Sequence, residues 1–244
     1  MSSRKASGRS HPQFPQAEFW AGARDMLPLI IGAIPFGIIF GTLATSNGLS
    51  VGGTLAMSML VFAGSSQFIA VGMVAAGTGW MLIVFTALIV NLRHLLYAVS
   101  LLPYVQSLPQ QWKAVLGFFL TDEAFAIAIR RYERGDRSPF KHWYYLGAAL
   151  AMYLNWQACT WLGITIGQTI PNAAEWGLDF AMSATFIGMV VPYVKTKPMG
   201  MAVGVAGVVA LLAYPLPHKL GLMVAAIAGI AAGVCSERAF PSPE

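Results

Sequence analysis

The feature of this sequence that most constrains its fold is a succession of long apolar runs. A helix of about 20 apolar residues crosses the roughly 30 Å hydrocarbon core of a bilayer. By that measure the chain offers about seven or eight spans, because the last two runs are short enough to form a broken or re-entrant pair. The runs cover approximately residues 25–45, 52–75, 80–102, 112–129, 143–167, 178–194, 199–214 and 219–235.

The composition argues against a soluble fold. Hydrophobic residues make up 57% of the 244 residues and charged residues only 10%, whereas soluble domains carry about 25% charged residues. A transmembrane β-barrel would show short segments of alternating polarity, and these runs are continuous. The sequence therefore predicts an all-α fold, a polytopic bundle of transmembrane helices.

Lysines and arginines are distributed in the way that sets membrane topology. With the amino terminus in the cytoplasm, most of the 15 basic residues fall on the cytoplasmic side, as the positive-inside rule requires. These are Arg4, Lys5, Arg9, Arg24, Arg130, Arg131, Arg134, Arg137, Lys141, Lys195, Lys197 and Arg238, while Lys113 and Lys219 fall outside. The pattern indicates a multi-pass protein of a bacterial inner (plasma) membrane, in contact with lipid and not with nucleic acid.

The chain divides into a membrane domain and two tails. Residues 1–18 are predicted to be a disordered cytoplasmic tail, residues 19–236 the transmembrane domain, and residues 237–244 a second cytoplasmic tail. Within the domain, one set of residues is echoed by another about 125 positions later: Gly37, Gly41, Ala56-Met57-Ser58 and Gly64 against Gly163, Gly167, Ala181-Met182-Ser183 and Gly188. Either the domain has parallel repeat halves, at about 25–129 and 143–236, or glycine-rich helices match by chance.

The third span contains a dense group of polar side chains. Asn91 and His94 share one helix face, and Arg93 and Tyr97 share an adjacent one. A charged side chain at the centre of a membrane helix costs about 2.5–3.5 kcal/mol, so Arg93 needs a partner or a wet cavity. It either fixes packing by pairing with an acid or binds a substrate carboxylate.

Two acids in the fourth span are the predicted partners of Arg93. Asp122 and Glu123 fall at a similar depth, on a helix expected to lie antiparallel to the third span. We expect Arg93 to pair with one of them. The other carboxyl could then carry a proton, which would couple transport to the proton gradient.

The first and second spans contain residues that interrupt a helix. Pro35 removes a backbone hydrogen bond and is predicted to break or kink the first span. Gly64, Ser65, Ser66 and Gln67 interrupt the second, and a discontinuous helix exposes backbone N–H groups that can bind a substrate. The alternative for this second group is close packing of small residues.

Several of these residues stand in motifs that resemble a known family. The motifs are residues 34–41 (IPFGIIFG), 62–68 (FAGSSQF), 90–97 (VNLRHLLY) with Ser100 and Pro103, 121–123 (TDE) and 177–180 (GLDF) with Phe186 and Pro192. They are similar to the large subunit of the AzlC-type branched-chain amino acid exporters, over about residues 25–192. The resemblance implies a permease that exports leucine, isoleucine or valine together with a small membrane subunit of the AzlD type.

These observations combine into one expected mechanism. The amino-acid substrate would lie between the first two spans and the 91–97 face, with its carboxylate near Arg93 or exposed backbone amides. Its side chain would meet Phe62, Phe68 and methionines. The predicted binding residues are Gly64, Ser65, Ser66, Gln67, Asn91, Arg93, His94 and Tyr97, and the predicted proton-coupling or ion-pair residues are Asp122 and Glu123.

Two other functions compete with a permease. The chain could be a scaffold subunit whose partner forms the transport path. It could also be an intramembrane hydrolase that uses Ser65 or Ser66 with His94, but the serines lack the G-x-S-x-G context, so we expect no enzyme. The histidines are scattered and Cys159 and Cys235 stand alone, so we expect neither a metal nor a cofactor.

Overall fold

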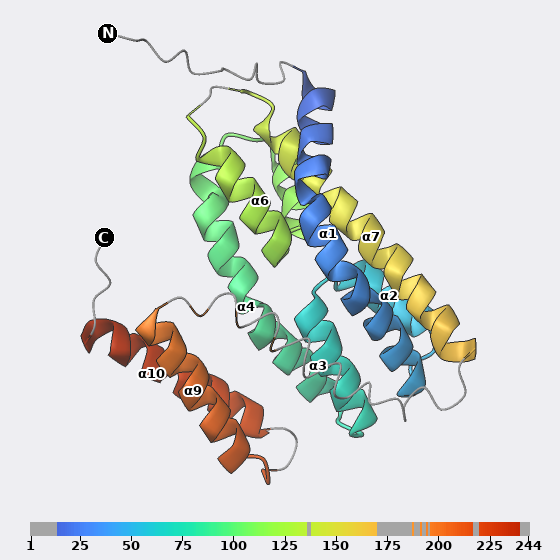
Figure 1. The fold of residues 1–244 in the computed structure, drawn as a ribbon, viewed down its shortest axis with the longest axis vertical. Helices are drawn as coiled ribbons and strands as arrows, with labels where there is room; N and C mark the ends of the chain where they lie inside the picture. The colour runs from blue at the N-terminus through green and yellow to red at the C-terminus, as the bar shows by residue number, and fades with distance from the viewer. Residues whose placement is uncertain are drawn as a thin grey trace.

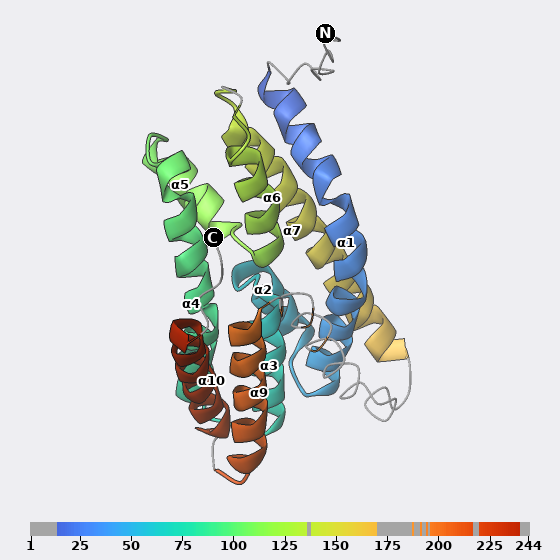
Figure 2. The ribbon, with the colours of Figure 1, turned by 60° about the vertical axis from the view of Figure 1, so that its left-hand side comes forward.

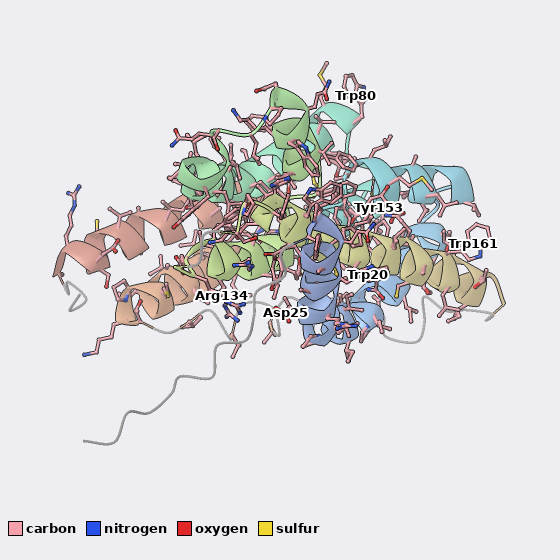
Figure 3. All side chains as sticks on the ribbon, turned by 90° about the horizontal axis from the view of Figure 1, so that it is seen from above. Trp20, Asp25, Trp80, Arg134, Tyr153 and Trp161 are labelled. Atoms are coloured by element: carbon pink, nitrogen blue, oxygen red, sulfur yellow. The ribbon has the colours of Figure 1, made fainter. Side chains whose placement is uncertain are left out.

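The computed structural model describes residues 14–135, 138–169, 187, 191, 194, 196–216 and 220–239. Its elements in that part of the chain are α-helices (Figure 1), which confirms the all-α class. Two of them, α1 (Pro15–Ser46) and α4 (Trp80–Val105), are long and apolar enough to cross a bilayer. Trp80 and Trp161 point outward from the bundle in Figure 3, and they are 70% and 54% exposed. The exterior is therefore apolar and aromatic, as lipid requires.

Helices α1 and α7 (Lys141–Thr169) run side by side in the same direction and form the spine of the bundle (Figure 1). Glycines bring their backbones together: a methyl group on Gly41 would collide with the carbonyl oxygen of Thr160, and one on Gly163 with that of Ile38. Gly37 and Gly167 lie in the same interface. The two glycine pairs that echo each other in the sequence therefore pack against each other, while a duplication of the domain stays a prediction.

The second apolar run folds as a re-entrant pair of helices, α2 (Val51–Leu60) and α3 (Gly64–Ala75), with a tip at residues 61–63. We call this pair the first hairpin. Helix α2 runs antiparallel to α7, because Ser58 contacts Thr160 at 3.0 Å and the Met59 carbonyl accepts from Tyr153. Helix α3 then returns antiparallel to α4 to the end of the bundle where α1 finishes (Figure 2). An interruption of this run is confirmed, but it lies at residues 61–63, and Gly64–Gln67, which were predicted to interrupt the helix, form the first turn of α3.

The fourth apolar run also folds back on itself, which the sequence analysis missed. Helices α5 (Gln110–Phe118) and α6 (Asp122–Tyr132) form a second hairpin with its tip at residues 119–121. Helix α5 runs parallel to α7 toward the middle of the bundle. Helix α6 then runs beside α4 to the end of the bundle where α1 begins (Figure 2). The contacts that trace this path are Trp112–His142, Tyr145–Leu116, Phe119–Tyr153, Tyr97–Asp122 and Tyr104–Tyr132.

The second hairpin changes the side on which one charge lies. The loop between α4 and α5 is at the end of the bundle where α1 begins, which we call the N-terminal end. Lys113, predicted on the outside, therefore lies at the same end as Arg130, Arg131 and Arg134. The separation of basic residues between the two ends is sharper than counting straight spans suggested.

Helix α1 begins at Pro15, inside the segment predicted to be a disordered tail. Glu18 is fully buried, and both of its carboxylate oxygens accept hydrogen bonds from Arg131 of α6, itself only 2% exposed. Ser138 donates to the same carboxylate at 2.7 Å. The first turn is therefore anchored by a partner 113 positions away, a contact that local sequence cannot reveal.

Helices α9 (Lys197–Leu212) and α10 (Leu220–Ala239) form an antiparallel pair over the last two predicted spans. Gly229 and Gly233 of α10 face Ala206 and Ala202 of α9. Helix α10 continues to Ala239, inside the predicted C-terminal tail. Most of the predicted span at 178–194 lies outside the described residues, as do residues 1–13, 240–244 and the echoed stretch 181–183.

Candidate functional site

A cavity of about 350 Å³ lies where the tips of the two hairpins meet α1, α4 and α7. Each tip is a short non-helical segment directly before a short helix, α3 in the first hairpin and α6 in the second. The cavity is therefore lined partly by irregular backbone, which membrane proteins tolerate where it lines a polar space. The lining residues are Pro28, Leu29, Gly32, Ala33, Phe36, Phe62, Ala63, Gly64, Ser65, Arg93, His94, Thr121, Asp122, Glu123, Met152 and Trp156.

Arg93 connects the two hairpin tips. One guanidinium nitrogen lies 2.9 Å from a carboxylate oxygen of Asp122, and the other donates to the Ser65 hydroxyl at 2.6 Å. Tyr97 donates to the second Asp122 oxygen at 2.7 Å. The predicted ion pair is confirmed, with Asp122 as the acid. The Arg93 side chain is still 32% exposed, so it remains accessible from the cavity.

The first turns of α3 and α6 present groups of opposite polarity to the cavity. Ala63, at the N-cap of α3, has no side-chain acceptor, so the first N–H groups of that helix are left for another partner. Together with the helix dipole they favour an anion. At the start of α6, Thr121 caps the Ala124 N–H, and two acids occupy the first turn. The cavity therefore has a donor pole and an acidic pole.

The structure places the predicted binding residues in two groups. Gly64, Ser65, Arg93 and His94 line the cavity, as do Asp122 and Glu123. The remaining four do not line it. They are Ser66, which donates to the Ala63 carbonyl; Asn91, which donates to Ser66; Tyr97, which holds Asp122; and Gln67, which is fully buried.

Pro35 does not break its helix. Helix α1 is continuous from Pro15 to Ser46 through both Pro28 and Pro35. A proline is accommodated in a membrane helix when neighbouring helices hold the segment, and the close α1–α7 contact does so here. The proline that lines the cavity is Pro28, seven positions earlier.

An apolar wall of the cavity comes largely from residues that sequence reasoning did not select. Phe36, Met152 and Trp156 belong to it, whereas Phe68, which we expected there, is buried against Phe40. The indole N–H of Trp156 is buried without a partner in the described part of the chain. The polar residues could be found because lipid penalises them. Apolar wall residues carry no such signal.

The serines do not form a nucleophile–base pair with His94. Within the described residues, Ser65 accepts from Arg93, while Ser66 bonds to Ala63 and Asn91. A hydrolytic serine needs its base within hydrogen-bond reach. The arrangement favours binding over covalent chemistry.

Comparison with known proteins identifies the family of this chain. A family model described as AzlC protein matches residues 28–170. The chain is 32% identical over 221 residues to the Inner membrane protein YgaZ of Escherichia coli K12, covering 89% of this chain and 88% of that one. It is 31% identical over 176 residues to the Branched-chain amino acid transport protein AzlC of Bacillus subtilis 168, covering 70% and 68%. The chain belongs to the AzlC family.

The AzlC match contains the whole candidate site. Its limits run from Pro28 to residue 170, so they include every lining residue from Pro28 to Trp156 and both hairpins, and they exclude α9 and α10. The relatives are named as membrane proteins or a transport protein, which agrees with the apolar helices of this AzlC-family chain. No solved structure matches it.

Proposed function

We propose that this chain is a permease subunit that exports branched-chain or related hydrophobic amino acids, with its substrate site between the two hairpin tips. The observation that carries the proposal is the cavity itself. It combines a donor pole, an acidic pole and an apolar wall in a space of about 350 Å³, within the size range of small-molecule sites. A zwitterion with an apolar side chain needs those three surfaces.

Each part of the substrate has a matching group. The carboxylate would accept from the free N–H groups of Gly64 and Ser65 and lie near Arg93. The ammonium would lie near Glu123, which has no ion-pair partner in the described part of the chain. The branched side chain would pack on Phe36, Met152 and Trp156.

The two hairpins suggest how the site could open to either side. They enter from opposite ends of the bundle, and their tips are joined through Arg93, which contacts Ser65 on one and Asp122 on the other. Inverted elements around a central site are a common basis of alternating access. Separating one hairpin at a time would expose the cavity to one side of the membrane.

Glu123 is the proposed proton carrier. Asp122 is held by Arg93 and Tyr97, whereas Glu123 lines the same cavity and forms no ion pair with a described residue. A proton arriving at Glu123 would compete with the substrate ammonium for the same carboxylate. Such competition is the simplest way for a proton gradient to drive export.

The remaining parts of the proposal concern the setting. The amino terminus and the basic N-terminal end would face the cytoplasm, in the inner (plasma) membrane of a bacterium. A small AzlD-type membrane subunit would assemble with this chain, which would provide the transport path. The competing view is that this chain is a scaffold and its partner provides the path.

Efflux from proteoliposomes tests the proposal. Vesicles holding this chain, with and without the partner, would be loaded with radiolabelled leucine, valine or lysine under an imposed pH gradient. We expect gradient-dependent efflux of leucine and valine but not lysine. Arg93→Gln should abolish it, whereas Lys197→Gln, which does not line the cavity, should not. If Arg93→Gln assembles with the partner and transports normally, the chain is a scaffold.

A further inference from the structure

The indole ring of Trp156, which forms part of the apolar wall of the cavity, is held in place by α1 and α3. A methyl group on Gly64 would lie 3.2 Å from its Cη2, and one on Gly37 would lie 3.7 Å from its Cε3. One face of the ring stacks on Phe40, with centroids 6.2 Å apart and an angle of 25° between the planes. Because glycine backbones make the two edge contacts, no flexible side chain at these points can move aside for the ring.

The other residues of the apolar wall can adapt more easily to a substrate. Met152 lies one turn before Trp156 on α7, and its unbranched thioether side chain has three rotatable bonds. Phe36 is only partly buried, so its ring is packed on fewer sides. A larger substrate side chain would therefore displace Met152 or Phe36 first, because moving Trp156 requires a shift of the α1 or α3 backbone.

Little space is left for the substrate side chain between this ring and the charged groups. The cavity of about 350 Å³ is near the lower end of the range for small-molecule sites. The ammonium and carboxylate of an amino acid would occupy the part next to the hairpin tips. Apolar pockets discriminate between side chains that differ by one methylene by about 10–200-fold. A fixed ring in the wall of such a space therefore limits the size of the side chain.

We propose that Trp156 determines which amino acids are transported, because it sets an upper limit on the size of the side chain. Aliphatic side chains up to about the size of leucine are accepted, and aromatic side chains are rejected because they would overlap the indole. This role of Trp156 depends on the amino-acid site proposed above and adds the selection among amino acids at that site.

Trp156 can be replaced without breaking a hydrogen bond of the described fold. Its indole N–H is buried and has no acceptor among the described residues, so a smaller side chain removes only packing contacts. Trp156→Phe keeps an aromatic ring that can stack on Phe40, while Trp156→Leu removes more of the wall. Both changes enlarge the space beside the substrate, and Trp156→Phe still tests the size limit if Trp156→Leu fails to fold.

Competition binding to the purified full chain in detergent tests this role. Radiolabelled leucine is displaced by unlabelled leucine or phenylalanine, and the readout is the ratio of the phenylalanine to the leucine dissociation constant. We expect the wild-type chain to bind leucine at least about tenfold more tightly than phenylalanine. Trp156→Phe or Trp156→Leu should lower the ratio roughly tenfold, the size of effect that a small steric mismatch has in an apolar pocket.

Trp161→Leu is the matched control. Trp161 lies on the same helix, points outward from the bundle (Figure 3) and does not line the cavity, so its replacement should leave the ratio unchanged. A purely structural role of Trp156 would weaken the binding of both amino acids equally. An unchanged ratio or loss of both ligands in a folded Trp156 variant would therefore overturn the size limit, as would equal binding of both amino acids by the wild-type chain.

Failure of the proposed function gives a different result. If the wild-type chain binds no leucine, the amino-acid site itself is contradicted, and the selection by Trp156 is contradicted with it. If the wild-type chain binds leucine and the ratio stays the same in the Trp156 variants, only the size limit is contradicted and the amino-acid site stands.

Discussion

At the scale of single residues, the backbone of Phe62 is the most unusual feature of the site. Its φ is 39°, in the left-handed region that costs a non-glycine residue about 1–2 kcal/mol. Its ring packs edge-on against Tyr153, 4.9 Å away, at the tip of the first hairpin. Strained residues of this kind persist where the surroundings hold them, and they gather at functional sites.

We predict that Phe62→Gly unfolds less readily than Phe62→Ala, by about 1 kcal/mol, because both lose the ring but only glycine relieves the backbone. Denaturant unfolding in detergent measures the difference. Phe118, in α5, provides the control pair, where Ala should be the more stable substitution by about 0.5–1 kcal/mol. The same order of stability at both positions would show that the Phe62 backbone is unstrained.

Individual polar residues were also the part of the site that could best be predicted from the sequence. That Arg93 pairs with Asp122 or Glu123 could be predicted from their similar depth, because lipid penalises an unpartnered charge, and the structure selects Asp122. The sequence Thr121-Asp122-Glu123 contained a further signal that we did not use. A capping threonine followed by two acids marks the start of a helix, and it would have located the second hairpin tip. Trp156 could not be found, because an apolar span contains many such residues.

At the scale of elements, the parallel contact between α1 and α7 depends on glycines. We predict that Gly163→Ala destabilises the protein by about 1–3 kcal/mol, because the added methyl overlaps the Ile38 carbonyl and forces the helices apart. Gly72→Ala, in α3, is the control, since nothing lies near its Cβ position, and it should be neutral or stabilising. Thermal unfolding of the two variants compares them directly. Equal effects would show that the α1–α7 contact is looser than described.

A second prediction at this scale concerns the ion pair that ties α1 to α6. Arg131→Met leaves Glu18 as a buried, uncompensated charge, so it should destabilise by about 3–5 kcal/mol. Combining it with Glu18→Met should recover much of that loss, because an apolar pair replaces a buried ion pair at little cost. A double-mutant cycle of unfolding free energies measures the coupling. Additive losses would mean that the two side chains act independently.

The elements also show the limit of reading spans from apolar length. Residues 52–75 and 112–129 satisfy the length criterion for a crossing helix, yet each folds as two short helices. A local interruption of the first run was readable from the small and polar residues at 64–67, although the break itself lies at 61–63. The reversal of direction was not, because it depends on contacts with α7 and α4 that lie 25 to 102 positions away.

At the scale of the whole molecule, the hairpins decide which loops share a side of the membrane. Straight spans would put the loop at 76–79 on the cytoplasmic side and the loop at 106–109 outside. Re-entrant hairpins put them the other way round, because α4 is then the first return crossing. The second arrangement also leaves Lys113 beside the other basic residues, which the positive-inside rule favours.

Thiol accessibility in intact cells distinguishes the two arrangements. In a background with Cys159 and Cys235 replaced by serine, we predict that Ala76→Cys reacts with a membrane-impermeant maleimide from outside, while Gln106→Cys reacts only after permeabilisation. Glu133→Cys is the internal reference, because both arrangements place it in the cytoplasm. Labelling of Gln106→Cys but not Ala76→Cys in intact cells would restore four straight crossings before α7. It would also remove the opposed hairpins on which the proposed alternating opening depends.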